Sequence, residues 1–309
     1  MIQIFNSHKL PDFIGDIHGH YDHLIKLLLK LGYKKYKDEY IHEERIPVFL
    51  GDYINRGPDS LAVVDLIIKM QRAGNAYALM GNHEFNFLAY HFKDKAGIFF
   101  RPNTETYYGY ISASKKPIDE SGRLIEILNW MQDLPLIITG EYFTAVHAQW
   151  SQQHEEVISY SGLKKMDENS MRYIHQNNEL LNPVSEVLKG KEIELNNDFD
   201  LKYGLTLKNK KFRFLWWKTN RTNKLKDWMD VPNEFKNILI EKEDLLDFEN
   251  ISDQNKPIFF GHYWLNPIEF GLQSDKWCCL DYSVANGGFI GAYRFNNELN
   301  LVESNLTHS

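Results

Sequence analysis

The chain has 309 residues, and its 35 basic and 42 acidic side chains leave a formal net charge of −7 at pH 7. An apolar fraction of 43 % and a charged fraction of 25 % are ordinary for a soluble globular protein and argue against a disordered chain. The acidic balance also argues against general binding to nucleic acid or to an acidic membrane, because both need a basic face.

Targeting and redox signals favour the cytoplasm. No apolar run approaches the roughly 20 residues that a membrane-spanning helix needs. The first ten residues lack the basic start and the long apolar stretch of a secretory signal. The adjacent Cys278 and Cys279 cannot form a disulfide scaffold, and we expect two reduced thiols on a core strand. We therefore expect a cytoplasmic protein without a membrane partner.

The first third of the chain alternates short apolar strands with amphipathic helices. Strands are predicted at residues 13–14, 48–50 and 77–80, and each ends at a glycine. Apolar residues at helical spacing predict helices between them, over residues 21–31 and 58–74. This β-α-β-α-β order indicates a layered α/β protein.

The composition and the spacing of apolar residues change in the remainder of the chain. From about residue 151 to 255 it is richer in Asn, Lys, Glu and Asp, and its apolar spacing is mostly helical. This stretch fits either a separate domain or an insertion. Residues 257–260, 276–280 and 289–295 are again predicted as strands, with a turn at residues 286–288 between the last two.

Polar side chains follow each of the three strands predicted in the first third. Asp16 and His18 come after the first strand, and in an extended segment both would face one side, where they could grip one metal ion. Asp52 and Arg56 follow the second strand, and Asn82 follows the third. Because parallel strands bring their carboxyl ends together, where α/β proteins usually bind ligands, we expect one shared site.

Two later predicted strands end on histidines. His147 closes the apolar run Phe-Thr-Ala-Val, and His262 follows Phe-Phe-Gly. A single histidine after a strand is usually structural. Because the earlier strands are also followed by polar clusters, we interpret these two histidines as part of the same site. Tyr263 and Trp264, which come next, fit either the mouth of a pocket or core packing.

As an ordered set, these motifs resemble those of the calcineurin-like metallophosphoesterases. The matching segments are GDIHG at 15–19, GDYINRG at 51–57, GNHE at 81–84, His-Ala at 147–148 and Gly-His at 261–262. The branch most similar to the chain contains the serine/threonine phosphoprotein phosphatases and bacterial diadenosine-tetraphosphatase-like enzymes. The resemblance runs from residue 13 to about 294, loosely over 151–255, and the family's closing Asp-Thr-Gly reads Asp-Tyr-Ser at 281–283.

This resemblance implies an α/β (α+β layered) fold in which two facing β-sheets are flanked by helices, with a mainly helical insertion. It also implies two divalent metal ions, Mn, Fe or Zn, whose oxygen and imidazole ligands suit these metals. The implied ligands are Asp16 and His18 on the first ion, Asp52 on both, and Asn82, His147 and His262 on the second. The two ions would share a hydroxide that attacks phosphorus directly.

The resemblance assigns three further roles. His83 would protonate the leaving oxygen, as suits a group that titrates near neutrality. Arg56 would bind the phosphoryl oxygens through its fork of donors. This branch often supplies a second arginine from the insertion, and between Arg213 and Arg221 we select Arg221. Both also fit solvated surface arginines.

One position departs from the family pattern. Asn55 stands where the family has an aspartate that pairs with the histidine corresponding to His83. An amide can still orient the imidazole, but it cannot stabilise the imidazolium by charge. We therefore expect His83 to be a weaker source of protons.

The sequence thus predicts a dimetal phosphoester hydrolase acting on phosphoproteins or on nucleotides such as dinucleoside polyphosphates. The alternative is a non-catalytic protein that binds phosphorylated ligands, with a retained metal site and weakened acid catalysis, which Asn55 alone supports. His147 and His262 lie on either side of residues 151–255, and both are needed in one site. We therefore expect a single domain over 1–309, with 151–255 as an insertion within it.

Overall fold

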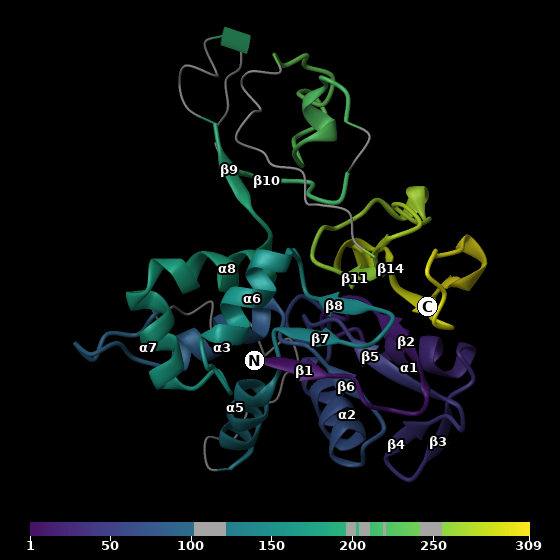
Figure 1. Cartoon of the computed structure of the whole chain (residues 1–309). Coiled ribbons are helices and arrows are strands. Elements are labelled where there is room, and N and C mark those ends of the chain that lie inside the picture. The colour runs from purple at the N-terminus through teal and green to yellow at the C-terminus, as the bar shows by residue number, and fades with distance from the viewer. Residues whose placement is uncertain (102–121, 196–201, 204–210, 219–220, 242–254) are drawn as a thin grey trace. The chain divides into compact units, whose positions relative to one another are not determined.

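The computed structural model describes residues 1–101, 122–195, 202–203, 211–218, 221–241 and 255–309 (Figure 1). The chain divides into two units. The first comprises Met1–Leu188 with Asn255–Ser309, and the second comprises Lys189–Gln254. Residues 151–188 of the predicted insertion therefore belong to the first unit.

The first unit contains a mixed sheet built around the strands predicted in the first third. Its strand order is β13-β14-β2-β5-β6, and β15 pairs with β14. The strands are β2 (Leu10–Ile14), β5 (Arg45–Phe49), β6 (Tyr77–Ala78), β13 (Asp281–Tyr282), β14 (Phe289–Arg294) and β15 (Leu306–His308). β2, β5 and β6 are parallel, whereas β14 is antiparallel to β2. The three predicted strands and their parallel direction are confirmed.

A second mixed sheet completes the first unit, in the order β1-β7-β8-β11-β12. Its strands are β1 (Ile2–Ile4), β7 (Ile137–Thr139), β8 (Thr144–Val146), β11 (Ile258–Phe260) and β12 (Trp277–Cys279). β11 is parallel to both β8 and β12. Cys278 and Cys279 are buried free thiols of β12, as expected.

The hydrophobic core lies between these two sheets. Phe13 of β2 stacks on Phe259 of β11 with ring centroids 3.7 Å apart, and both side chains are fully buried. Phe143 and Phe295 pack edge-on against Phe13. This aromatic cluster holds the two sheets face to face, in agreement with the predicted architecture.

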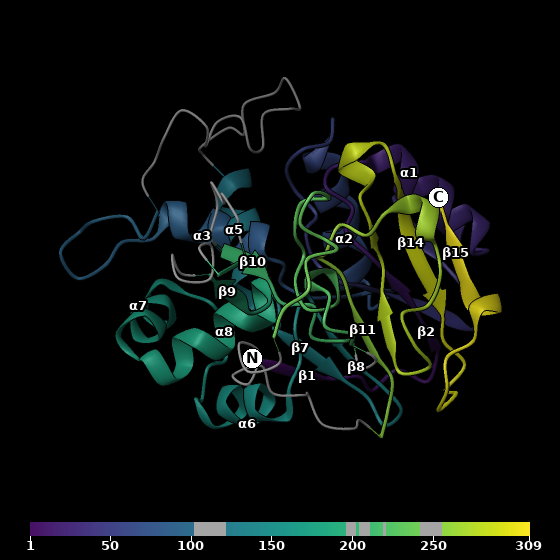
Figure 2. The same cartoon turned by 90° about the horizontal axis from the view of Figure 1, so that it is seen from above.

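Helices cover the β2–β5 sheet and the edges of the unit. The long helices are α1 (Tyr21–Lys30), α2 (Ser60–Arg72), α3 (Asn82–His91), α5 (Arg123–Asp133), α6 (Gln152–Tyr160), α7 (Glu168–Gln176) and α8 (Asn178–Lys189). α1 packs against α2 and β14 (Figure 2). The Asp59 carboxylate caps α2 by accepting the Ala62 N–H at 3.0 Å, which explains why this helix begins where Pro58–Asp59 predicted. Among the described residues, no helix is long and apolar enough to cross a membrane.

Shorter elements complete the first unit. They are the hairpin of β3 (Lys34–Tyr36) and β4 (Glu39–Ile41), and the 3₁₀ turns η3 (Pro267–Glu269), η4 (Val284–Asn286) and η5 (Glu303–Asn305). η4 lies between β13 and β14 and contains the start of the turn predicted at 286–288.

The described part of the second unit consists of short strands and turns, unlike the helical segment that precedes it. Its described elements are the antiparallel pair β9 (Glu192–Glu194) and β10 (Lys211–Arg213), and the 3₁₀ turn η1 (Leu225–Asp227). The prediction of mainly helical structure up to residue 255 therefore holds for α6 to α8 and fails for β9 and β10. Each of these strands buries one central apolar residue between charged neighbours, and three residues are too few for a period to show. Trp216 and Trp217 are buried in this unit, and residues 242–254 lie outside the described chain.

Candidate active site

The six side chains predicted to bind metal all lie in the first unit, beyond the carboxyl ends of its strands. Asp16 follows β2, Asp52 follows β5, and Asn82 begins α3 directly after β6. His147 follows β8 and His262 follows β11 in the facing sheet. Because β8 and β11 are parallel neighbours, they bring these two histidines together across the intervening residues 151–255.

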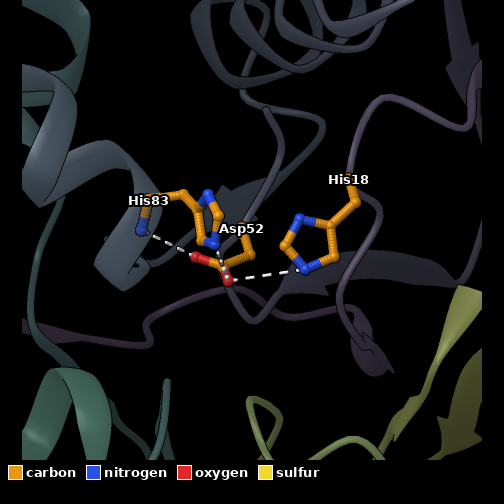
Figure 3. A group of neighbouring side chains, drawn as sticks. All are labelled: His18, Asp52 and His83. Atoms are coloured by element: carbon orange, nitrogen blue, oxygen red, sulfur yellow. Dashed lines mark hydrogen bonds and ion pairs between the residues drawn. The ribbon is translucent and has the colours of Figure 1, made fainter. Parts of the chain in front are cut away.

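One group of ligand atoms surrounds the Oδ2 atom of Asp52 (Figure 3). The His18 Nε2 atom lies 3.6 Å from Asp52 Oδ2, and the His83 Nε2 atom lies 3.7 Å from it. The Asp16 Oδ2 atom lies 3.9 Å from His18 Nε2. Asp16, His18 and Asp52 are all almost fully buried.

A second group lies on the other side of the same carboxylate. The His147 Nε2 atom is 3.4 Å from Asp52 Oδ1 and 3.1 Å from Asn82 Oδ1. The Asn82 Oδ1 atom is also 2.8 Å from His262 Nδ1. Asp52, His147 and His262 offer ligand atoms that lie within 4.8 Å of one another. Asp52 thus belongs to both groups.

Backbone contacts orient the imidazoles for metal binding. His147 donates its Nδ1–H to the Leu50 carbonyl at 2.8 Å, and His18 donates its Nδ1–H to the Ile54 carbonyl at 3.1 Å. Each contact leaves the Nε2 atom facing Asp52, an arrangement typical of metal-binding histidines. The His18 Nε2 atom is buried and has no hydrogen-bond partner among the described residues. The oxygen and imidazole donors therefore fit divalent Mn, Fe or Zn.

The electrostatics of the two groups favour an added positive charge. Burial, together with the neighbouring Asp281, raises the pKa of Asp16 well above its usual value. Burial lowers the pKa of His18 to about 3, which keeps this imidazole neutral and able to bind metal. Burial would lower the pKa of His147 too, but Asp52 raises it to about 10. The buried carboxylates thus draw a positive charge to His147, the charge that a metal ion supplies more strongly.

The site concentrates backbone strain. Six of the nine non-glycine residues with positive φ in the described chain lie here, namely His18, Asp52, Asn55, Arg56, His262 and Trp264. Such residues cost free energy and cluster at functional sites. The expectation that residues 16–18 are extended is wrong, because His18 has φ 45°. The N–H groups of Ile17 and His18 both donate to the Asp52 carbonyl, and this contact turns the chain.

The two side chains of the predicted acid pair, Asn55 and His83, are in contact. Asn55 Nδ2 lies 2.6 Å from His83 Nδ1, and in this orientation the amide donates to a neutral imidazole whose proton is on Nε2. The Asn55 Oδ1 atom is buried without a hydrogen-bond partner among the described residues. Burial lowers the pKa of His83, and the nearby Arg56, His147 and Arg101 add to this effect, whereas Asp52 opposes it.

The two arginines predicted to bind phosphate lie in different units. Arg56 is exposed, and its guanidinium carbon lies 4.1 Å from the centre of the Trp264 ring. Arg221 belongs to the second unit, where it donates to the carbonyls of Leu215 and Trp216 at 3.1 and 3.4 Å. Its guanidinium also lies over the rings of Phe214 and Trp228, and burial lowers its pKa to about 10. A role for Arg221, or for Arg213 of β10, at the phosphate stays a prediction.

Sequence reasoning missed two buried carboxylates that hold the site loops in place. Glu84 accepts the N–H groups of Asp52 and Tyr53, both at 2.9 Å, and of Gly81 at 3.1 Å. Burial raises its pKa to about 7. Asp281 accepts the N–H of Trp264 at 2.9 Å. Glu84 could have been found as the third residue of a helix that begins after Gly81, the position of a capping-box glutamate.

Comparisons with known proteins agree with this geometry. A model of the calcineurin-like phosphoesterase family matches residues 12–263. The asymmetrical bis(5′-nucleosyl)-tetraphosphatase PrpE of Halalkalibacterium halodurans is 45 % identical over 73 residues, which cover 23 % of this chain and 30 % of that protein. The symmetrical bis(5′-nucleosyl)-tetraphosphatase of Wigglesworthia glossinidia brevipalpis is 35 % identical over 133 residues, which cover 43 % and 36 % of the two chains. The chain thus spans about a third of the length of these curated relatives.

A solved structure shares the fold. A protein serine/threonine phosphatase from Saccharomyces cerevisiae, described as similar to human phosphatase PP5, superimposes with a TM-score of 0.52 at 15 % identity. The match covers 100 % of this chain and 82 % of the yeast chain. At this identity the likeness concerns the fold alone.

Proposed function

Because the chain belongs to the calcineurin-like phosphoesterase family, we propose that it hydrolyses phosphoesters with the help of divalent metal ions. The observation that carries this proposal is that two groups of neighbouring ligand atoms share Asp52, one with His18 and His83 and the other with His147 and His262. Residues 1–188 and 255–309 supply all of these groups, in keeping with one catalytic domain that residues 189–254, rather than the whole of 151–255, interrupt.

Six side chains would hold the ions. In our proposal these are Asp16 and His18 for the first ion, Asp52 for both, and Asn82, His147 and His262 for the second. When bound, the ions would supply Lewis-acid activation of the attacking water and neutralise charge on the phosphoryl group. Mn, Fe and Zn all suit this donor set.

The chain's own residues would handle the proton and the substrate. In our proposal the His83 imidazolium, whose Nε2 faces Asp52, gives its Nε2 proton to the leaving oxygen. The ring then returns to the neutral imidazole, with its remaining proton on Nδ1 beside the Asn55 amide. The Glu84 carboxylate fixes the backbone of Asp52 and Tyr53, so the loop after β5 keeps its shape as substrate binds. Arg56 is exposed beside this loop and would bind the phosphoryl oxygens.

Dinucleoside polyphosphates are the substrate class that the relatives favour. Both curated relatives described above carry the name bis(5′-nucleosyl)-tetraphosphatase. The partly exposed Trp264 offers an aromatic face next to Arg56, as a nucleotide site needs. Phosphoproteins remain the second class to test.

The non-catalytic alternative rests on Asn55. Its Nδ2 atom lies 2.6 Å from His83 Nδ1, so the amide can orient the ring, but an N–H donated to Nδ1 favours the neutral imidazole over the imidazolium. Turnover of the native chain and of Asn55→Asp therefore decides between the hydrolase and the binding protein.

Hydrolysis of p-nitrophenyl phosphate by the Mn²⁺-loaded full chain tests the proposal. We expect turnover in the native chain and a loss of at least about 100-fold in Asp52→Asn, which weakens both ligand groups, while Asn129→Asp on the exposed face of α5 changes little. Bis(5′-nucleosyl) tetraphosphate and a set of phosphoserine and phosphotyrosine peptides then separate the substrate classes. If neither the native chain nor Asn55→Asp, each folded and loaded with metal, hydrolyses any of these substrates, the result would favour the non-catalytic binding protein.

A further inference from the structure

The loop after His262 places an aromatic ring under the exposed arginine of the site. The guanidinium carbon of Arg56 lies 4.1 Å from the centre of the Trp264 ring, a distance typical of a cation–π contact. The same ring lies edge-on to His18, with centroids 6.4 Å apart. Trp264 therefore connects the arginine to the wall of the metal-ligand cluster.

This ring is held in place by its backbone. Trp264 has φ 51°, an unfavourable conformation for a bulky side chain. The Trp264 N–H donates to Asp281 Oδ2 at 2.9 Å, and the Leu265 N–H donates to the Asp281 carbonyl at 2.9 Å. On the other side, the His262 N–H donates to the two carboxylate oxygens of Asp16 at 3.2 and 3.3 Å. Two buried carboxylates thus hold the loop, and the strain at Trp264 is balanced by these contacts.

Arg56 has little else to orient it. Its side chain is exposed, and among the described residues no carboxylate forms an ion pair with it. A free arginine side chain samples many rotamers, and ordering it on substrate binding costs affinity. Stacking uses the flat face of the guanidinium and leaves the N–H donors at its edge free for phosphate oxygens. An arginine lying on Trp264 can therefore stack and bind phosphate at the same time.

We propose that Trp264 is a positioning residue, which holds the Arg56 guanidinium flat and pre-orders its donors for the phosphoryl group. This inference rests on the proposed function and adds to it a residue that neither the metal ligands nor the acid pair includes. The Asp281 carboxylate supports the arrangement through the Trp264 backbone.

Kinetics and a thermodynamic cycle test the proposal in the Mn²⁺-loaded full chain. Trp264→Leu should raise both KM for p-nitrophenyl phosphate and the inhibition constant of inorganic phosphate about 3- to 10-fold, the range of a partly exposed cation–π contact. Trp264→Phe should keep most of the effect, since it retains a π face. Tyr160→Leu, which removes an aromatic ring that is 89 % exposed, serves as the matched control and should change neither constant.

The coupling to Arg56 separates positioning from general disturbance. In an Arg56→Ala background, Trp264→Leu should have no further effect, because nothing remains to be positioned. Effects of the two substitutions that simply multiply would overturn the proposal. Unchanged constants in Trp264→Leu would overturn it too.

A spectroscopic readout is independent of turnover. In the Zn²⁺-loaded full chain, the Arg56 side-chain Nε–Hε signal, assigned with Arg56→Lys, should be shifted upfield by the Trp264 ring current. The shift should vanish in Trp264→Leu and persist in Trp264→Phe. If the native chain hydrolyses none of the substrates, the proposed function fails. The Arg56 Nε–Hε signal and the affinity for inorganic phosphate would still decide the role of Trp264. An unshifted Arg56 signal in the native chain would refute the stacking itself, even where Trp264→Leu fails to fold.

Discussion

Restoring a carboxylate beside His83 should strengthen the acid of the proposed reaction. Asn55 Nδ2 lies 2.6 Å from His83 Nδ1, so Asn55→Asp puts a negative charge in direct contact with the imidazole. Burial together with Arg56, His147 and Arg101 now holds the His83 pKa below its usual value, whereas Asp52 opposes them. A contacting opposite charge raises a pKa by roughly 1–3 units.

This shift sets the expected gain. Each unit by which the pKa rises increases the protonated fraction of His83 about tenfold at a pH above that pKa. A weaker acid also gives up its proton less readily, which cancels roughly half of the gain on a logarithmic scale. We therefore expect kcat to increase about 3- to 30-fold for substrates whose departure needs a proton, and the alkaline limb of the pH profile to move upward. The added charge is buried, since Asn55 is 4 % exposed, so part of the gain is lost to desolvation.

The assay compares leaving groups. Phenyl phosphate, with a poor leaving group, should show the full gain, whereas p-nitrophenyl phosphate should change by less than about 3-fold. Asn129→Asp adds the same charge on an exposed position of α5 and serves as the control. Equal changes for both substrates, or lower turnover of phenyl phosphate at unchanged metal content, would refute this reasoning about His83.

Three further predictions concern stability. Phe259→Ala should lower the free energy of unfolding by about 3–5 kcal/mol in denaturant titrations, because it removes the ring stacked on Phe13 between the sheets; a cost below about 1 kcal/mol would contradict that account. Asp59→Ala should cost about 1 kcal/mol and Asp59→Asn much less, since only the first loses the cap of α2; equal costs would show that the cap contributes nothing. Saturating Mn²⁺ should raise Tm by about 5 °C or more relative to EDTA, and Asp52→Asn should abolish most of this shift. A full shift in that variant would exclude Asp52 as a shared ligand.

The predictable part of the fold is local. Apolar runs that end in glycine located β2, β5 and β6, and helical spacing located α1 and α2. The three-residue strands β9 and β10 were not predictable, because each has only one buried apolar residue. Their pairing joins residues 17 to 21 positions apart, beyond the reach of a local pattern.

The candidate site divides in the same way. The residue types at the strand ends predicted the donor set, and the structure brings all six of these side chains close together. The positive φ of His18 was not foreseen, since it depends on hydrogen bonds to the Asp52 carbonyl in the loop after β5. The capping-box position of Glu84 could indicate its contact with Gly81, but its contacts with the N–H groups of Asp52 and Tyr53 join distant residues and carry no sequence signature.

The amino-acid sequence by itself determined which donor side chains follow which strands, and that an amide stands at Asn55 where the family pattern has a carboxylate. These properties depend on residue identity and short spacing, which need no knowledge of distant contacts. Only the tertiary structure decided that β8 and β11 lie side by side and so bring His147 to His262 across residues 151–255. It alone placed Trp264 under Arg56, because that contact joins two loops that are distant in the chain and are each held by a buried carboxylate. Long-range packing, rather than local preference, sets such distances.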